Sequence, residues 1–223
     1  MAPAETIIEP LVRSDTLVTL VGGGVVGSDD LKWALARAPL LVAADGAAET
    51  VLAAGYLPDA VIGDMDSVGP ARRLIAPDRL FEIAEQDTTD FEKCLARITA
   101  PGVLAIGFLG KRLDHSLATL STIARRRSRC LLIGPKDVAF AAPARVDLDL
   151  KAGTRVSLFP FAPVTGRSNG LRWPIDGLEL SPTGRIGTSN EALGHVSLHA
   201  EGLIVLLPRA ARDRAFKALF KEN

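Results

Sequence analysis

The sequence lacks any excess of charge of one sign, because lysine and arginine total 26 and aspartate and glutamate also total 26. A formal net charge of zero argues against a general nucleic-acid or membrane binder, so we expect neither partner. No uncharged apolar run approaches the ~20 residues needed to span a bilayer, and residues 1–15 do not follow the pattern of a signal peptide. We therefore expect a cytoplasmic protein.

Cysteine is scarce as well, with Cys94 and Cys130 the only two. Two lone cysteines in apolar segments are more typical of a reduced, cytoplasmic protein than of a disulfide framework. Hydrophobic residues at 48% and charged residues at 23% exclude wholesale disorder. A chain of 223 residues is also long enough to bury a core without a bridge or a structural metal.

Strand and helix patterns alternate through residues 1–140. Continuous apolar strands that alternate with helices are typical of α/β proteins, in which helices cover both faces of a mostly parallel sheet. We predict strands over residues 17–21, 40–44, 59–63, 80–83, 103–108 and 130–133, and helices over 28–38, 47–54, 70–75, 89–98 and 113–126.

The pattern changes after about residue 143, where short alternating segments are separated by turn residues. Such segments predict a small antiparallel sandwich or barrel. We therefore predict an α/β domain over residues 1–142 and a C-terminal antiparallel β-sandwich domain over residues 143–223. The strands expected in the second domain span residues 146–150, 155–160, 178–180, 195–199 and 203–207.

A glycine-rich segment at residues 22–27 fits the pattern G-x-G-x-x-G between a predicted strand and a helix that begins with Ser28 as its N-cap. With Asp45 at the end of the next strand, the segment indicates an NAD-type oxidoreductase. A turn that merely closes a strand–helix unit explains a single match equally well. Both interpretations allow a phosphate beside free backbone N–H groups.

Aspartates gather at the predicted C-terminal ends of the strands, which is the edge where open parallel sheets bind ligands. Asp64 and Asp66 are two residues apart, so in an extended segment their side chains point the same way. Several carboxylates on one edge repel each other unless a cation lies among them, and Mg²⁺ prefers such oxygen ligands. For Asp90 and Asp114 singly, helix capping is the simpler explanation. The candidate carboxylates are Asp45, Asp64, Asp66, Asp87, Asp90 and Asp114.

Cationic side chains flank Asp114, with Lys111 and Arg112 before it and His115 after it. Beside a metal site they would suit phosphate oxygens, and Arg112 could make a bidentate contact. A solvated loop is an alternative for Lys111, and a packing residue at a helix N-terminus is an alternative for His115.

In the second predicted domain, Trp173 could stack on a flat cationic heteroaromatic ring. Ser189 and Asn190, in a polar turn, could hydrogen-bond the edge of such a ring. Taken alone, a core tryptophan is the better interpretation of Trp173.

Six segments together resemble the thiamine pyrophosphokinase (thiamine diphosphokinase) family. One such segment is weak support, whereas six in the family's order across both predicted domains are strong support. The matching segments are residues 44–46, 58–67, 86–93, 112–115, 170–173 and 188–191.

The resemblance implies an α/β domain that binds ATP and Mg²⁺, and a β-sandwich that binds thiamine. It implies a homodimer whose active sites are shared between subunits. The implied reaction converts ATP and thiamine into AMP and thiamine diphosphate.

The resemblance also implies roles for particular residues. Asp64, Asp66 and Asp87 would hold or orient Mg²⁺, and Asp87 or Asp90 would take the proton of the thiamine hydroxyl. Thiamine would contact Trp173, Ser189 and Asn190. The site of ATP and its phosphates would be lined by Asp45, Gly46, Ser67, Asp90, Lys111, Arg112, Asp114 and His115.

Two alternatives remain open at this point. An NAD-type oxidoreductase built on residues 22–27 would leave the Asp64–Asp66 pair unexplained. A non-catalytic thiamine or nucleotide sensor is disfavoured because the chain retains every expected carboxylate. The chain departs from the usual family pattern at Met65, at Ala47–Glu49 and at Lys111, and no departure removes a carboxylate.

Overall fold

A parallel sheet forms the first part of the molecule, as predicted. The computed structural model describes residues 8–220, and six of its strands pair in parallel in the order β8-β7-β2-β3-β4-β5. The central strands are buried along their whole length, which explains their continuous apolar sequence. The strands are β2 (Val18–Val21), β3 (Leu40–Ala44), β4 (Ala60–Gly63), β5 (Leu80–Glu82), β7 (Val103–Ile106) and β8 (Cys130–Ile133).

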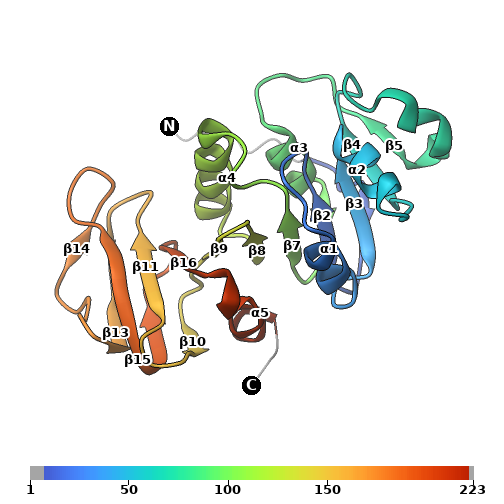
Figure 1. Cartoon of the computed structure of the whole chain (residues 1–223). Coiled ribbons are helices and arrows are strands. Elements are labelled where there is room, and N and C mark those ends of the chain that lie inside the picture. Colours follow the sequence, from blue (N-terminus) through green and yellow to red (C-terminus); the bar gives the residue numbers. More distant parts are fainter. Residues whose placement is uncertain (1–7, 221–223) are drawn as a thin grey trace.

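Helices cover both faces of this sheet (Figure 1). Side chains of α1 (Ser28–Leu35) and α2 (Ala47–Ala53) pack against one face, and side chains of α3 (Asp90–Ala96) and α4 (Leu113–Arg126) pack against the other. Because successive residues of a strand point to opposite faces, each strand contributes to both cores. Two short 3₁₀ helices, η1 (Gly69–Leu74) and η2 (Pro77–Arg79), lie between β4 and β5.

The C-terminal part consists of antiparallel strands, also as predicted. β15 has 13 residues, and its first half pairs with β11 while its second half pairs with β10 and β13. Two further strands, β12 (Val164–Thr165) and β14 (Glu179–Leu180), pair only with each other. The longer strands are β9 (Asp137–Ala141), β10 (Val146–Asp149), β11 (Arg155–Phe159), β13 (Arg167–Leu171), β15 (Gly187–His199) and β16 (Ile204–Pro208).

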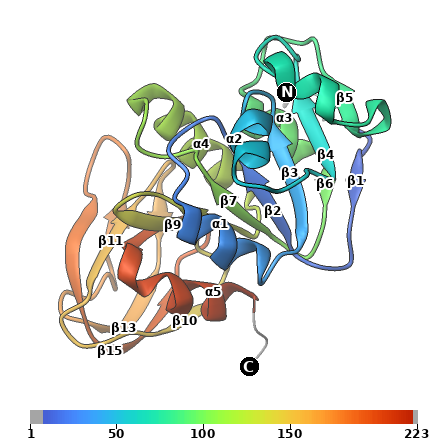
Figure 2. The same cartoon turned by 45° about the vertical axis from the view of Figure 1, so that its right-hand side comes forward.

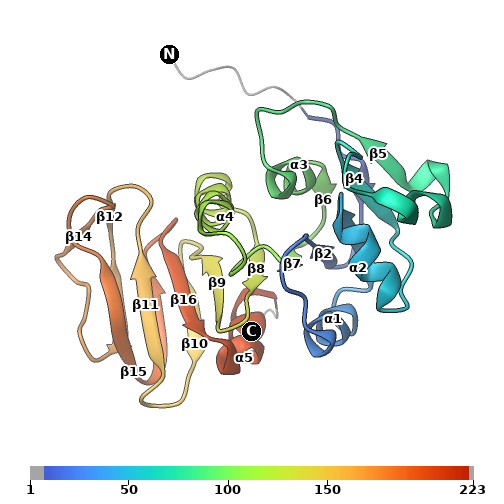
Figure 3. The same ribbon diagram turned by 45° about the horizontal axis from the view of Figure 1, so that its top comes forward.

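One strand joins the two parts into a continuous sheet (Figure 3). β9, which the sequence analysis missed, pairs antiparallel with β8 on one side and with β16 on the other. The division between residues 142 and 143 therefore stays a prediction, because hydrogen bonds run across β9 from the first part to the second. A small parallel pair, β1 (Val12–Arg13) with β6 (Ile98–Thr99), was also not predicted.

The chain closes with η3 (Arg209–Ala211) and a helix that was not predicted, α5 (Arg212–Phe220). Figure 2 shows α5 beside α1, and the ring of Phe216 meets the ring of Trp33 edge-on at 5.7 Å between centroids. Trp33 is thus a buried core tryptophan. No helix in residues 8–220 has the length and apolar character required to cross a membrane.

The predicted start of α1 needs one correction. Gly27, rather than Ser28, occupies the N-cap position, and no side chain caps the helix there. The buried carboxylate of Asp30 instead accepts hydrogen bonds from Arg209 at 2.6 Å and from Arg212 at 2.8 Å. Charge from the far end of the chain therefore stabilises this helix terminus.

Candidate functional site

Three aspartates lie together at the edge of the parallel sheet. Asp45 follows β3, and Asp64 and Asp66 follow β4, which pairs directly with β3. Each offers a carboxylate oxygen, and the three oxygens lie within 4.8 Å of one another. Because Gly63 has no side chain, the backbone at Asp45 can approach closely: an added Cβ would lie 2.6 Å from the Asp45 Cβ. The pairing of the two strands therefore assembles this acidic group.

The backbone that presents the group is not extended, contrary to the sequence prediction. Met65 has a φ of 65°, in the left-handed region, and Asp45 has a φ of 36°. The side chain of Met65 is buried against the helices of one face, which accounts for an apolar residue between two acids. Asp64 and Asp66 therefore meet through a tight turn that is anchored by Met65.

Asp45 is the buried member of the group, with an exposed fraction of 4%. Its Oδ1 has no hydrogen-bond partner within residues 8–220. Burial, the nearby Asp66 side chain and the charges of Asp64 and Asp90 raise its pKa to about 6. A buried oxygen without a partner is costly, so this side chain suits a bound cation.

The other two carboxylates have partners within the chain. The amide of Gln86 donates to Oδ2 of Asp64 at 3.0 Å, and this hydrogen bond lowers the pKa of Asp64. The hydroxyl of Ser67 donates to Oδ1 of Asp66 at 2.7 Å. Ser67, which the resemblance placed at the ATP site, thus supports Asp66, and Gly46 next to Asp45 is the N-cap of α2.

A cavity opens beside the acidic group, between the glycine-rich loop and the starts of α3 and α4. Two cationic side chains, one imidazole and one carboxylate line it, those of Lys111, Arg112, His115 and Asp90. The lining residues are Gly23, Gly24, Ala44, Thr89, Asp90, Phe91, Gly107, Phe108, Lys111, Arg112, His115 and Thr119.

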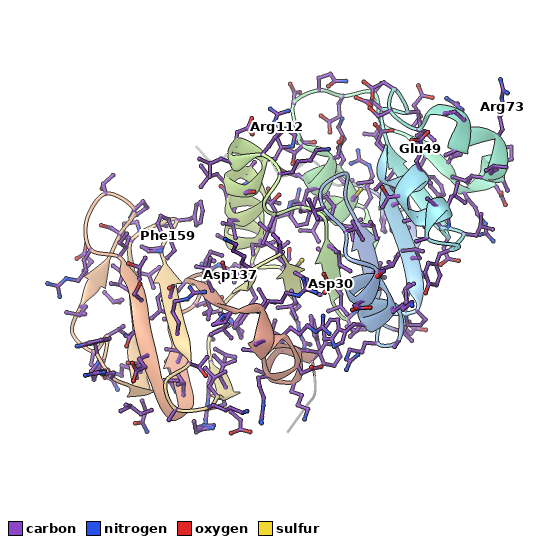
Figure 4. All side chains as sticks on the ribbon, in the orientation of Figure 1. Asp30, Glu49, Arg73, Arg112, Asp137 and Phe159 are labelled. Carbon is purple, nitrogen blue, oxygen red and sulfur yellow. The ribbon has the colours of Figure 1, made fainter. Side chains whose placement is uncertain are left out.

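The cations of this cavity are held by neighbouring groups. The Lys111 ammonium donates to the carbonyl of Gly23 at 3.2 Å. Arg112, which lies at the start of α4 (Figure 4), donates to Asp114 through two nitrogens, at 3.1 and 2.5 Å. These hydrogen bonds lower the pKa of Asp114 to about 2. Asp114 therefore orients Arg112 and is not among the residues that line the cavity.

Asp87 lies in the loop before α3. Among the described residues, Asp87 is exposed and is not a member of that group, so its metal role stays a prediction. The carboxylate of Glu85 accepts hydrogen bonds from the backbone N–H of Asp87 at 2.8 Å and from that of Thr88 at 3.1 Å. The sequence analysis missed Glu85, because a carboxylate that closes its own turn leaves no pattern in the sequence.

Thr89 is the N-cap of α3, the helix predicted from residue 89. The side chain of Thr89 accepts a hydrogen bond from the backbone N–H of Glu92 at 3.3 Å. Asp90 follows directly and lines the cavity. Partial burial and the nearby charges of Asp64 and Asp66 raise the pKa of Asp90, although the charge of Lys93 opposes that rise.

A second cavity lies among the antiparallel strands and is lined by Trp173, Ile175, Leu178, Ile186, Thr188, Asn190 and neighbouring residues. Trp173 is 55% exposed, so the interpretation as a core tryptophan is wrong. The buried Asn190 amide donates to the Trp173 carbonyl at 2.7 Å, and its oxygen accepts from the Trp173 N–H at 3.2 Å. Asn190 thereby fixes the backbone that presents the indole ring.

Ser189 lies between Thr188 and Asn190, two residues that line the second cavity. It has a φ of 60°, and it is not among the residues that line the second cavity. Its backbone N–H donates to the Ser157 hydroxyl at 3.1 Å. Any contact of Ser189 with a ligand stays a prediction.

The molecule belongs to the class of α/β proteins that bind ligands at the carboxyl ends of parallel strands, because carboxylates, a lysine and an arginine gather at that edge. Antiparallel strands that carry a second cavity, with Trp173 in its lining, continue the sheet. The family model "Thiamin pyrophosphokinase, catalytic domain" matches residues 31–133. The family model "Thiamin pyrophosphokinase, vitamin B1 binding domain" matches residues 144–203. The chain belongs to the thiamin pyrophosphokinase family, which confirms the predicted family and enzyme class.

Named relatives agree with this assignment. Thiamine pyrophosphokinase 1 of Oryza sativa subsp. japonica is 30% identical over 190 residues, which cover 69% of this chain and 72% of that protein. Thiamine pyrophosphokinase 2 of Arabidopsis thaliana is 28% identical over 159 residues, which cover 60% of this chain and 58% of that protein.

Solved structures share the fold. The thiamin pyrophosphokinase of Geobacillus thermodenitrificans has a TM-score of 0.70 at 23% identity, with 86% of this chain and 96% of that chain covered. The thiamin pyrophosphokinase of Candida albicans has a TM-score of 0.71 at 15% identity, with 90% and 92% covered. These similarities confirm the predicted fold class.

Proposed function

We propose that the protein transfers the diphosphate group of ATP to the hydroxyl of thiamine and releases thiamine diphosphate and AMP. The observation that carries this proposal is the match of both family models, in order, to the two parts of the chain. It is supported by a cavity that brings cationic side chains to the acidic edge of the sheet. A match to the model of a catalytic domain favours this activity over the oxidoreductase and sensor alternatives.

The acidic group fits a bound Mg²⁺. Asp45, Asp64 and Asp66 offer three oxygens within 4.8 Å, and the buried Oδ1 of Asp45 has no partner among the described residues. Carboxylates are the ligands that Mg²⁺ takes in proteins, together with water and phosphate oxygens. When bound, the ion would offset the charge of the ATP phosphates. Asp87 is a proposed further ligand, since it lies in the loop that adjoins Gln86 and hence Asp64.

The residues around the cavity would bind and orient the phosphates. Lys111 and Arg112 supply positive charge there, His115 adds an imidazole to the lining, and Asp114 keeps the Arg112 guanidinium in place. Asp90 lines the same cavity, whereas Asp87 does not, which favours Asp90 as the acceptor of the hydroxyl proton. Positioning and charge neutralisation account for most of the catalysis in such transfers.

We also propose a homodimer with shared active sites. The second cavity, where we expect thiamine to bind, contains Trp173, which lies in the connection between β13 and β14. We refer to it below as the thiamine cavity. In Figures 1 and 3, β14 and the strand β4 that precedes Asp64 stand at opposite ends of the molecule. A second subunit could bring its own thiamine cavity to the acidic edge of the first. A cytoplasmic location stays a prediction from the sequence.

The decisive experiment incubates the protein with thiamine, ATP and Mg²⁺ and quantifies every nucleotide and thiamine species. We expect equal amounts of AMP and thiamine diphosphate, and no product when EDTA removes the divalent cation. ADP together with thiamine monophosphate would instead show a simple kinase. Tight NAD(H) binding without turnover of thiamine would favour the oxidoreductase.

A further inference from the structure

Lys93 is a buried lysine next to the acidic group. It belongs to α3, and its side chain is only 2% exposed. Its ammonium lies 4.0 Å from Oδ2 of Asp64 and 3.9 Å from Oδ1 of Asp90. The sequence analysis included this residue in a matching segment but assigned it no role.

A charged ammonium is rarely buried unless it is paired, so its position requires compensation by the surrounding carboxylates. The two distances are at the outer limit of an ion pair, which makes the attraction electrostatic rather than a tight hydrogen bond. The charge of Lys93 acts on both neighbouring acids: it adds to the hydrogen bond from Gln86 in lowering the pKa of Asp64, and it opposes the rise that burial causes in the pKa of Asp90. Lys93 therefore offsets part of the negative charge of the whole edge.

The packing of α3 fixes the place of this charge. Phe91 and Cys94, on either side of Lys93, are buried in the core beneath the sheet, and the Cys94 thiol lies 3.6 Å from the carbonyl of Ile62 in β4. α3 is thus anchored to the strand that ends at the acidic turn. A side chain so enclosed has little surface with which to contact a ligand.

We propose that Lys93 is a positioning residue, a resident counter-charge that holds Asp64 and Asp90 at the sheet edge before a cation and phosphates bind. This inference rests on the proposed function, since it assigns the acidic group to a divalent cation. Without the buried ammonium, Asp64 and Asp90 would lose the cation that lies within 4.0 Å of both, and the repulsion among the carboxylates of the edge would increase. A divalent cation would then have to supply more of the compensation.

The test compares how far Mg²⁺ raises the melting temperature of the wild type and of Lys93→Met, which keeps the length and packing of the side chain but removes its charge. We expect the rise to be larger in Lys93→Met by at least ~3 °C. Lys93→Arg, which keeps the charge, should respond as the wild type does. The control is Lys32→Met, the same substitution on an exposed face of α1, which should leave the Mg²⁺ response unchanged.

A purely structural role would lower the melting temperature of Lys93→Met equally with and without Mg²⁺, and that result would overturn the proposal. Folding of Lys93→Met only in the presence of Mg²⁺ would support it. If Lys93→Met folds under neither condition, Lys93→Gln is measured in the same way and judged by the same criterion.

The same samples separate this proposal from the proposed function. If the wild type makes thiamine diphosphate with Mg²⁺ while the Mg²⁺ response of Lys93→Met equals that of the wild type, only the role of Lys93 is wrong. If the wild type makes no thiamine diphosphate at any Mg²⁺ concentration, the proposed function fails, and the role of Lys93 fails with it.

Discussion

In the acidic group, the Asp64 carboxylate is half-buried and the Asp66 carboxylate is exposed. Their loss should therefore lower turnover more than it lowers stability. Replacement of either by asparagine keeps the shape of the side chain and removes the charge that a cation needs. We expect Asp64→Asn and Asp66→Asn each to lower turnover on the order of 100-fold or more. Turnover is measured as AMP release, and circular dichroism checks the fold. Near-normal turnover in both variants would refute the metal role of this pair.

Asp45 should make stability depend on pH in an unusual direction. Its pKa is raised from 3.8 to about 6, so between these values the folded protein holds a proton that the unfolded chain releases. The free energy of unfolding should therefore fall as the pH rises through this window, by ~3 kcal/mol from Asp45. This fall is measured by urea titrations of the wild type and of Asp45→Asn, from pH 4 to pH 7 without divalent cations.

The comparison with Asp45→Asn is needed because other carboxylates act in the opposite direction. The pKa values of Asp64 and Asp114 are lowered, so their contributions to stability are lost as the pH falls. Subtracting the Asp45→Asn curve from the wild-type curve isolates the Asp45 contribution. Parallel curves would show that Asp45 ionises at its ordinary pKa.

At the scale of elements, an ion cluster joins α1 to η3 and to the first residue of α5. Asp30 pairs with Arg209 and Arg212, and its side chain is 5% exposed. Because removal of one partner leaves buried charge uncompensated, Asp30→Asn should lower the free energy of unfolding by ~3 kcal/mol. Chemical denaturation measures this change. Asp29→Asn, in the same turn but exposed, should change it by less than ~0.5 kcal/mol.

The ion cluster is reinforced by aromatic contacts along the same helix. The Trp33 indole donates to Asp213 at 2.9 Å, and the guanidinium of Arg212 lies 5.0 Å from the centre of the Trp33 ring. These contacts belong to the hydrophobic core that also includes residues of the antiparallel strands.

A loss of stability in Asp29→Asn equal to that in Asp30→Asn would contradict the prediction for Asp30. It would show that any negative charge in the first turn of α1, rather than the ion cluster, stabilises α1.

At the scale of the whole molecule, shared active sites predict complementation between two inactive variants. Trp173→Ala damages the thiamine cavity, and Asp64→Asn damages the acidic edge. If each site combines these parts from different subunits, a mixed dimer has one intact site, and equal mixing should restore about a quarter of wild-type activity. The variants are unfolded together, refolded and assayed for AMP release. Activity no higher than the sum of the separate variants would exclude shared sites.

The buried parallel strands and the acidic edge show how far sequence patterns reach. Runs such as Val103–Ile106 and Cys130–Ile133 were predictable, because a short, wholly apolar run is stable only where both faces of a strand are covered. The N-cap of α3 was also predictable, since the Thr89 hydroxyl accepts a hydrogen bond from the backbone N–H of Glu92, three residues away. The Glu92 carboxylate does not return the bond and instead accepts hydrogen bonds from Arg125. The apolar runs and the Thr89 cap depend on residues that are neighbours in the chain.

Other features escaped prediction because they depend on residues far apart in the sequence. β9 reads as an ordinary short apolar segment, and only its partners β8 and β16 make it the link between the two parts. The helix α5 is stabilised by packing against α1 and the sheet rather than by a pattern of its own. The exposure of Trp173 depends on Asn190, which is 17 residues away.

By itself, the sequence determined that parallel strands would end in carboxylates at one edge, because strand polarity and strand ends are local properties of the chain. Only the tertiary structure decided that Asp45, rather than Asp87, joins Asp64 and Asp66, and that Lys93 lies buried beside them. The physical reason is that distance and burial, which set the electrostatic energies of these groups, arise from the pairing of β3 with β4 and the packing of α3.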